Sequence, residues 1–280
     1  MNRVTAAVAL AAVAAASAAA AGTLAVPVAS AAMQTPRPVA VIGDFGSGSA
    51  HEQAVAAMVR KAEPVSVVTV GDNVYDSPDY QGLVGDYYGQ WIARKRFWPA
   101  VGNHDAAEGL AQFDAAFPYL RGAHVYSTGG GGIRFFVLDS TAALGSESAM
   151  QQQRAWLQKS LAASGARWRV VVLHHPPYSS GTVHGSSPEL RWPFREWGAD
   201  LVLAGHEHNY ERLVENGLTY VVDGSGGKDL YRLGPAIAGS MARDDVDYGA
   251  VLLRASATQL SGEFRTAEGR VVDRWTIAHG

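Results

Sequence analysis

Polar residues that could bind metal ions follow the apolar runs of this sequence, each at the point where a run ends. Asp139 apart, every one of these ends carries a side chain suited to metal binding, and the donors are oxygen and imidazole nitrogen only. The pattern predicts a metal site built where the runs stop. In chain order the residues are Asp44; Asp72 with Tyr75; Asn103, His104 and Asp105; Asp139; His174 and His175; and His206 with His208.

The apolar runs are predicted to be buried strands, which would bring these polar residues together. In open α/β sheets ligands gather beyond the carboxyl ends of the strands, where the loops converge on one crevice. His206 and His208 lie two residues apart, so on an extended segment both imidazoles point the same way. Taken singly, Asp44 could cap a helix or form an Asx-turn. The polar residues at the other strand ends could likewise form turns, or could be buried side chains whose polar atoms are hydrogen-bonded. Their joint occurrence in chain order favours the metal site.

Strands alternate with helices over most of the chain, and strands alone follow residue 218. Ser49 and Glu52 form a capping box that opens the first helix, and four consecutive glycines at 129–132 predict a hairpin tip. This order predicts mixed β-sheets stacked together with helices on the outside, in one catalytic domain. The predicted strands span residues 39–42, 65–70, 97–101, 133–138, 168–173, 199–203, 219–222, 250–255, 259–264 and 271–277, and the predicted helices span residues 49–61, 148–163 and 190–197.

Composition restricts the classes of function. The 280 residues are 48% hydrophobic and 18% charged, so the chain can bury a large core. The formal net charge is −3 and no block of Lys and Arg stands out, so nucleic acid is not an expected partner. The chain has no cysteine, which excludes disulfides and thiolate metal sites.

The N-terminus has the pattern of a secretory signal. No charged residue occurs from Val4 to Met33, and Ala29-Ser30-Ala31 offers a small-residue cleavage site. We expect residues 1–31 to be a signal peptide, residues 32–38 a linker and residues 39–280 the catalytic domain, with the mature protein secreted. The alternative is an uncleaved membrane anchor, because the apolar run is long enough to span a bilayer.

Five short blocks in chain order resemble the motifs of the calcineurin-like metallophosphoesterases, and in particular those of the purple acid phosphatases. The resemblance covers about residues 39–210. It implies a four-layer α/β/β/α sandwich of two mixed β-sheets flanked by helices. The blocks are Asp44-Phe45-Gly46, Gly71-Asp72-Asn73-Val74-Tyr75, Gly102-Asn103-His104-Asp105, Val171-Val172-Leu173-His174 and Gly205-His206-Glu207-His208.

One departure points to the purple acid phosphatases within that superfamily. Most metallophosphoesterases carry a metal-binding His two residues after the first Asp, where this chain has Gly46. Tyr75 stands where the purple acid phosphatases supply a phenolate to the same metal. A hard anion in place of a neutral imidazole favours a trivalent ion such as Fe(III). The simpler alternative for Tyr75 is a buried ring whose hydroxyl is hydrogen-bonded.

The resemblance implies a ligand set for two metal ions bridged by Asp72. Fe(III) would occupy the first site, and Fe, Zn or Mn in the divalent state would occupy the second. The implied ligands are Asp44, Asp72, Tyr75 and His208 for the first metal, and Asp72, Asn103, His174 and His206 for the second.

Two further histidines are implied to act on the substrate. His104 would bind phosphate oxygen in the transition state, and His184 would protonate the leaving alkoxide. A solvated loop histidine is the alternative for His184. We also expect the Tyr210-Glu211-Arg212 segment to brace the His206 loop.

The function implied is that of a secreted acid phosphatase, in which a metal-bound hydroxide attacks a phosphate monoester. A phosphodiesterase of the same fold and a non-catalytic module stabilised by its metals are the two alternatives. The expected partner is a small phosphorylated substrate. Neither nucleic acid, nor an obligate protein partner, nor stable membrane association after signal cleavage is expected.

Overall fold

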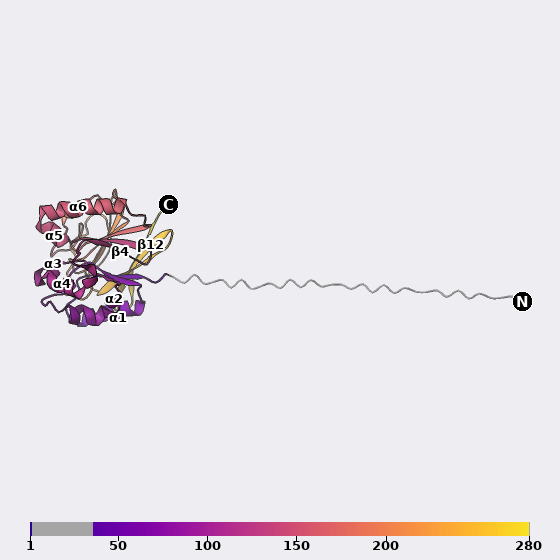
Figure 1. Ribbon diagram of the computed structural model, residues 1–280, viewed down its shortest axis with the longest axis horizontal. Helices are drawn as coiled ribbons and strands as arrows, with labels where there is room; N and C mark the ends of the chain where they lie inside the picture. The colour runs from indigo at the N-terminus through magenta and orange to yellow at the C-terminus, as the bar shows by residue number, and fades with distance from the viewer. Residues whose placement is uncertain (2–35, 280) are drawn as a thin grey trace. The chain divides into compact units, whose positions relative to one another are not determined.

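The computed structural model describes Met1 and residues 36–279. Every element given below belongs to the unit that begins at Pro36 (Figure 1). The predicted signal peptide and the first part of the predicted linker lie outside the described residues apart from Met1, so the domain organisation stays a prediction. Among the described residues, no helix has the length and apolar character needed to cross a membrane.

A six-stranded mixed sheet contains the first three strands of the chain. Its order is β13-β12-β11-β1-β2-β3, with β1, β2 and β3 parallel and the other neighbours antiparallel. The strands are β1 (Val39–Ile42), β2 (Ser66–Thr69), β3 (Phe97–Trp98), β11 (Gly249–Ala255), β12 (Gln259–Thr266) and β13 (Val271–Ala278).

A seven-stranded mixed sheet contains the remaining strands. Its order is β10-β8-β9-β7-β6-β5-β4, and β5, β6, β7 and β9 run parallel to one another. The strands are β4 (Tyr126–Gly130), β5 (Ile133–Val137), β6 (Trp168–Val172), β7 (Leu201–Ala204), β8 (Tyr210–Glu215), β9 (Leu218–Asp223) and β10 (Ser240–Asp244).

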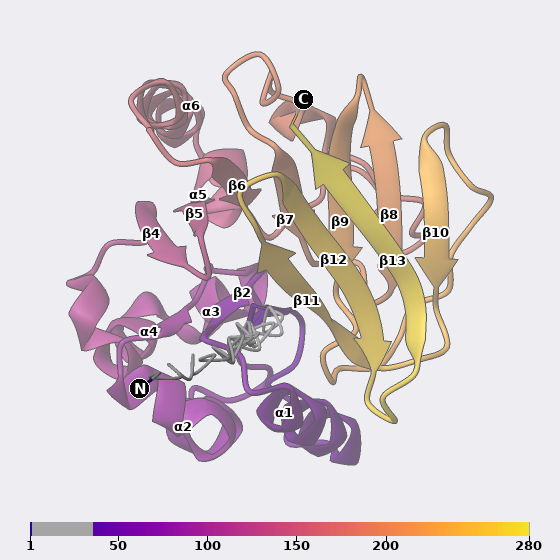
Figure 2. The same ribbon diagram turned by 90° about the vertical axis from the view of Figure 1, so that its right-hand side faces the viewer.

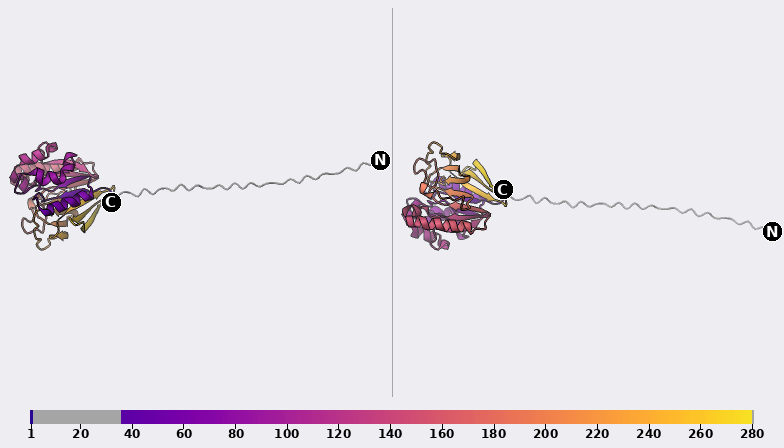
Figure 3. Two further views of the ribbon diagram at one scale, coloured as in Figure 1. Left: turned by 90° about the horizontal axis from the view of Figure 1, so that it is seen from below. Right: turned by 90° about the horizontal axis from the view of Figure 1, so that it is seen from above.

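Helices cover the outer face of each sheet. Figure 1 shows α6 and α1 on opposite outer sides with strands between them, and Figure 3 shows the α1 side from below and the α6 side from above. In Figure 2, β11, β12 and β13 lie in front of strands of the other sheet, so the two sheets are stacked face to face, and α1 lies next to α2. The helices are α1 (Ala50–Ala62), a π-helix (Gln81–Gly85), α2 (Asp86–Ala93), α3 (Asn103–Glu108), α4 (Leu110–Ala116), a 3-10 helix (Pro118–Leu120), α5 (Ser140–Gly145), α6 (Glu147–Ala162) and a 3-10 helix (Pro188–Leu190).

Strand alternation explains the three cores. Along β1, Val39 and Val41 face the other sheet, whereas Ala40 and Ile42 face α1. In the other sheet, Val171 of β6 faces the helix side with Leu157 and Leu161 of α6. Both faces of the parallel strands are therefore buried, which is why these strands read as continuous apolar runs. The predicted four-layer α/β/β/α fold is confirmed.

The predicted helix at residues 190–197 is wrong. Only Pro188–Leu190 forms a short 3-10 helix, and the chain then turns irregularly. Pro193 explains this, because proline has no N–H to donate and disfavours helical geometry at the preceding Trp192. The predicted hairpin tip is confirmed, since β4 and β5 pair antiparallel around Gly131.

Candidate metal centre

The predicted ligand residues lie just past the carboxyl ends of the strands that precede them. Three of them, Asp44 (φ 55°), Asp72 (φ 50°) and His206 (φ 71°), adopt the left-handed backbone conformation. Residues other than glycine rarely adopt this conformation, and where they do the strain often marks a functional site. Asp139, the one strand end from which no ligand was expected, caps α5 by accepting a hydrogen bond from the Ala142 N–H at 2.8 Å.

Asp44, Tyr75 and His208 form the first group of donor atoms. The Tyr75 hydroxyl lies 3.1 Å from Asp44 Oδ1 and 3.0 Å from His208 Nε2. His208 Nε2 lies 3.4 Å from the same carboxylate oxygen. All three side chains are buried, and His208 Nδ1 donates to the Asp229 carbonyl at 2.7 Å, which directs Nε2 toward the group.

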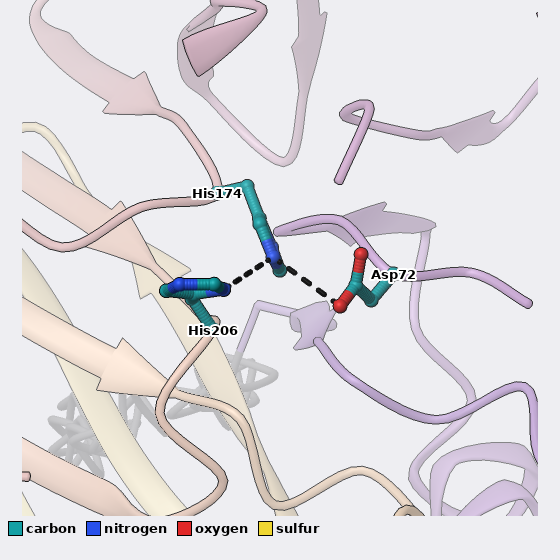
Figure 4. A group of neighbouring side chains, drawn as sticks. All are labelled: Asp72, His174 and His206. Carbon is teal, nitrogen blue, oxygen red and sulfur yellow. Dashed lines mark hydrogen bonds and ion pairs between the residues drawn. The ribbon is translucent and has the colours of Figure 1, made fainter. Parts of the chain in front are cut away.

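Asp72, Asn103, His174 and His206 form the second group, and Figure 4 shows three of them, Asp72, His174 and His206. His174 Nε2 lies 3.3 Å from Asp72 Oδ2, 2.9 Å from Asn103 Oδ1 and 3.1 Å from His206 Nδ1. Ligand atoms of Asp72, His174 and His206 all lie within 4.8 Å of one another. These three residues form a candidate buried metal site.

The chemistry of the second group fits a cation. His174 Nδ1 donates to the Val70 carbonyl at 2.9 Å, so a neutral His174 presents the Nε2 lone pair to oxygen atoms of Asp72 and Asn103. Burial opposes a charge on His174, yet attraction to Asp72 outweighs it and raises the pKa of His174 to about 9. Acceptor atoms that face one another in a buried site need a proton or a metal ion between them. The residues present therefore fit a bound metal.

The second group also affects the phenol of the first. Burial, followed by repulsion from Asp44 and then Asp72, raises the pKa of Tyr75 well above its usual value. A phenolate at Tyr75 would therefore require a metal ion of high charge to take the place of the proton. Asp72 therefore contacts His174 of the second group directly and also raises the pKa of Tyr75 in the first.

The backbone around Gly46 explains why no histidine stands there. A Cβ at Gly46 would overlap the Asn73 carbonyl, and the Gly46 carbonyl accepts the Tyr75 N–H at 2.9 Å. The loop after β1 is thereby tied to the loop that carries Tyr75. A side chain at Gly46 and the observed position of Tyr75 are incompatible in this backbone.

The predicted substrate histidines both lie at the edge of the site. The His104 ring lies 4.4 Å from the Tyr75 ring, and the backbone N–H of His104 donates to Asp72 Oδ1 at 2.9 Å. His184 is exposed, and its ring stacks on His206 at 4.0 Å. The structure thus brings His184 to the site, and its role in catalysis stays a prediction.

Glu207, Tyr231 and Lys228 were not assigned a role from the sequence. Glu207 is fully buried and accepts the N–H groups of His184 and Gly185, both at 2.5 Å. Tyr231 stacks on the His208 ring at 3.9 Å, and Lys228 Nζ lies 4.8 Å from the centre of the Tyr75 ring. Glu207 could have been noticed from its place between two histidines, but no local sequence signal marks Tyr231 or Lys228.

The expected bracing role of residues 210–212 needs correction. Tyr210 and Arg212 both donate to Asp273 on β13, at 2.8 and 2.6 Å, and do not contact the histidines. Glu211 accepts from the Ser180 N–H at 2.6 Å, which fixes the loop that leads to His184. Residues 210–212 follow the loop of His206 and His208 directly in the sequence, but they lie on β8, where their side chains bind Asp273 and Ser180 instead.

Of the remaining histidines among the described residues, His175 lies near the site and the others outside it. His175 contacts Ser140 Oγ through Nδ1 at 2.9 Å and lies 4.3 Å from the His206 ring. Burial, followed by repulsion from His174, lowers the pKa of His175 to about 3. Outside the donor groups, His51 stacks on Tyr248, His124 pairs with Asp114 and His279 pairs with Asp200.

A comparison with protein families places this geometry in a known context. The model of the calcineurin-like phosphoesterases matches residues 37–210, which contain every predicted ligand. The chain belongs to the calcineurin-like phosphoesterases. This phosphoesterase is 29% identical over 188 residues to purple acid phosphatase 5 of Arabidopsis thaliana, covering 61% of this chain and 43% of the relative. It is also 26% identical over 231 residues to human tartrate-resistant acid phosphatase type 5, covering 66% of this chain and 71% of the relative.

Solved structures support the fold of this phosphoesterase. A purple acid phosphatase from yellow lupin seeds has a TM-score of 0.67 at 22% identity, covering 86% of this chain and 53% of the lupin chain. GAP50, described as the anchor in the inner membrane complex of Plasmodium, has a TM-score of 0.72 at 18% identity. This match covers 87% of this chain and 89% of the GAP50 chain. At these identities the likeness concerns the fold alone. The predicted resemblance to the metallophosphoesterases is confirmed by the family and by the purple acid phosphatase relatives.

Proposed function

We propose that this phosphoesterase is a secreted acid phosphatase that hydrolyses phosphate monoesters with two metal ions. The observation that carries the proposal is that two groups of buried donor atoms share an influence of Asp72, whose carboxylate lies 3.3 Å from His174 in the second group and raises the pKa of Tyr75 in the first. A shared carboxylate is the arrangement needed to hold two cations close enough to act on one phosphate. The purple acid phosphatase relatives support the substrate class.

The residues that would hold the metals follow the two groups. Tyr75 supplies a hard anionic donor to the first group, which favours Fe(III), and the second group contains one anionic and three neutral ligands, which favours a divalent ion of Fe, Zn or Mn. When bound, the metals would neutralise phosphate charge and supply an activated water as nucleophile. The ligands are Asp44, Asp72, Tyr75 and His208 for the first metal, and Asp72, Asn103, His174 and His206 for the second.

The chain's own residues bind and orient the phosphate and move a proton. The backbone of His104 is held by the hydrogen bond from its N–H to Asp72, and its ring packs against Tyr75 at the edge of the centre. His184 is stacked on His206, where a ring nitrogen can donate a proton to the leaving oxygen. Glu207 fixes the backbone of the His184 loop.

An assay on paired substrates tests the proposed reaction. We expect the metal-replete protein to cleave an aryl phosphate monoester much faster than the matching diester. A strong preference for the diester would replace the proposal with a phosphodiesterase of the same fold. His51→Ala is a matched control for the histidine variants, because His51 stacks on Tyr248 away from the site.

The histidine variants separate an enzyme from a module that keeps metals only for stability. Neither His104 nor His184 belongs to the proposed ligand set, so the double variant His104→Ala/His184→Ala should keep its metals and lose most of its turnover. Undiminished turnover in this variant would contradict the proposed mechanism. A wild-type protein that binds two metals but turns over neither ester would be a non-catalytic module.

The proposal includes location and partners. Secretion is supported by the uncharged run from Val4 to Met33 and its small-residue cleavage site. The partner would be a small phosphorylated molecule, with no nucleic acid, no obligate protein partner and no stable membrane association after cleavage. Detection of the cleaved protein outside the cell, with its N-terminus near Ala32, tests the secretion.

A further inference from the structure

An arginine-lined hollow lies at the end of the six-stranded sheet opposite the metal centre. Its volume is about 550 Å³, and the buried Trp91 and Pro64 form part of its lining. Trp91 is held in place because its Nε1–H donates to the Pro64 carbonyl at 3.0 Å. Four exposed arginines surround these residues: Arg37, Arg60, Arg94 and Arg96.

The position of the hollow follows from the parallel strands. Arg37 lies just before β1, Pro64 lies just before β2, and Arg96 directly precedes β3. These are the amino-terminal ends of three parallel strands, whereas the metal ligands Asp44 and Asp72 follow the carboxyl ends. The hollow is therefore separated from the metal centre by the length of the strands.

The four guanidinium groups have no carboxylate partner among the described residues. Seven other arginines form ion pairs with Asp or Glu. Arg37 instead donates to the Glu63 carbonyl at 2.8 Å, and Arg60 donates to the Tyr87 carbonyl at 3.4 Å. Glu63 is the one acidic residue in the lining, so the hollow is strongly positive in a protein whose net charge is −3.

Helix ends explain only part of this cluster. Arg60 lies in the last turn of α1, and Arg94 caps the end of α2, where positive charge is favourable. Arg37 and Arg96 lie outside both helices and still line the same hollow. Four like charges around one hollow repel one another unless an anion lies between them.

We propose that this hollow is a second anion site, separate from the metal centre, which binds a small soluble ligand with several phosphate-type groups. The planar guanidinium group matches the oxygens of phosphate or sulfate with two parallel hydrogen bonds. Four such groups suit an anion of several charges better than a single phosphate. The buried Trp91 and Pro64 give the hollow an apolar lining for the ligand's carbon skeleton.

Calorimetric titration with myo-inositol hexasulfate tests the proposal. This probe carries clustered anionic groups but no phosphate ester for the enzyme to cleave. We expect the metal-replete protein to bind it at low salt, and Arg94→Gln/Arg96→Gln to bind about tenfold more weakly, since two charge-assisted contacts are lost. The matched control is Arg134→Gln/Arg167→Gln, two exposed arginines outside the hollow, and it should keep the wild-type affinity.

Two further measurements test whether the probe binds in the hollow and not in the active site. His104→Ala/His184→Ala should bind the probe as the wild type does, and Arg94→Gln/Arg96→Gln should keep its melting temperature and its hydrolysis of an aryl phosphate. The proposal is overturned if the wild type does not bind the probe, if Arg94→Gln/Arg96→Gln binds it as tightly as the wild type, or if the histidine variant loses binding. These outcomes do not depend on which ester the enzyme cleaves.

Discussion

Glu207 is expected to place His184, and its removal should impair proton donation to the leaving group. The carboxylate is fully buried and accepts two backbone N–H groups of the loop, those of His184 and Gly185, each at 2.5 Å. Hydrogen bonds to a charged group contribute about 1.5 to 3 kcal/mol each, so the loss of both in Glu207→Ala weakens the loop position by about 3 kcal/mol at the lower end of this range. This corresponds to a decrease of roughly 100-fold in the equilibrium ratio between the loop conformation that places His184 at the site and the other loop conformations.

Leaving-group dependence provides the assay. An alkyl phosphate needs a proton on its leaving oxygen, whereas an aryl phosphate with an acidic phenol needs little assistance. For Glu207→Ala we expect kcat on the alkyl ester to fall by about 100-fold, with a much smaller loss on the aryl ester. Glu207→Gln is the matched control, because its remaining oxygen can still accept both N–H groups.

A double-mutant cycle with His184→Ala excludes an indirect effect through the metals. If Glu207 acts through His184, the double variant loses no more activity than either single variant. Metal content is measured on every variant, because Glu207 lies between His206 and His208. Additive losses, or equal losses on the alkyl and aryl esters, would refute the positioning role.

Two other predictions concern stability. Gly46→Ala should lower the free energy of unfolding by about 3 kcal/mol, because the added Cβ would overlap the Asn73 carbonyl. Gly89 lies inside α2, where an added Cβ meets no atom within 4 Å, so Gly89→Ala should instead raise the free energy of unfolding by about 0.5 to 1 kcal/mol. Chemical denaturation that found equal stabilities for these two variants would contradict the packing argument. Burial raises the pKa of Glu52 from 4.5 to about 7, against opposing hydrogen bonds from the loop. The folded state then binds this proton more tightly than the unfolded state, so stability should fall from pH 4.5 to 7 by up to about 3 kcal/mol. Glu52→Gln should flatten this slope, and an unchanged slope would show that other groups cause it.

Most of the strands, and the strand ends that carry the candidate ligand residues, were predictable because they depend on local patterns, whereas β4, β8 and β10 were not predicted. A buried parallel strand is a short apolar run, and the residue after it points into the crevice, as Asp44 and Asp72 do. Helix α2 was missed because Gly85 and Gly89 lie at its start and in its interior, which weakens the helical signal. The helix predicted at residues 190–197 does not form, because Pro193 disfavours helical geometry despite the apolar pattern of this segment.

The features that sequence could not predict depend on contacts between distant segments. Tyr231 reaches His208 because a loop after β9 returns to the site, and no local pattern encodes that path. The arginine-lined hollow shows the same limit. Arg94-Lys95-Arg96 is only a short basic run in the sequence, and the fold brings it together with Arg37 before β1 and Arg60 in α1.

Anomalous scattering from crystals of the metal-replete protein tests the central claim most directly. Data collected on both sides of the iron absorption edge should show two cations close together, with Asp72 bridging them and Tyr75 bound to iron. In Tyr75→Phe, the visible absorption of the iron–phenolate bond should disappear. One cation, or two that do not share Asp72, would contradict a centre built from two groups of donors around one carboxylate.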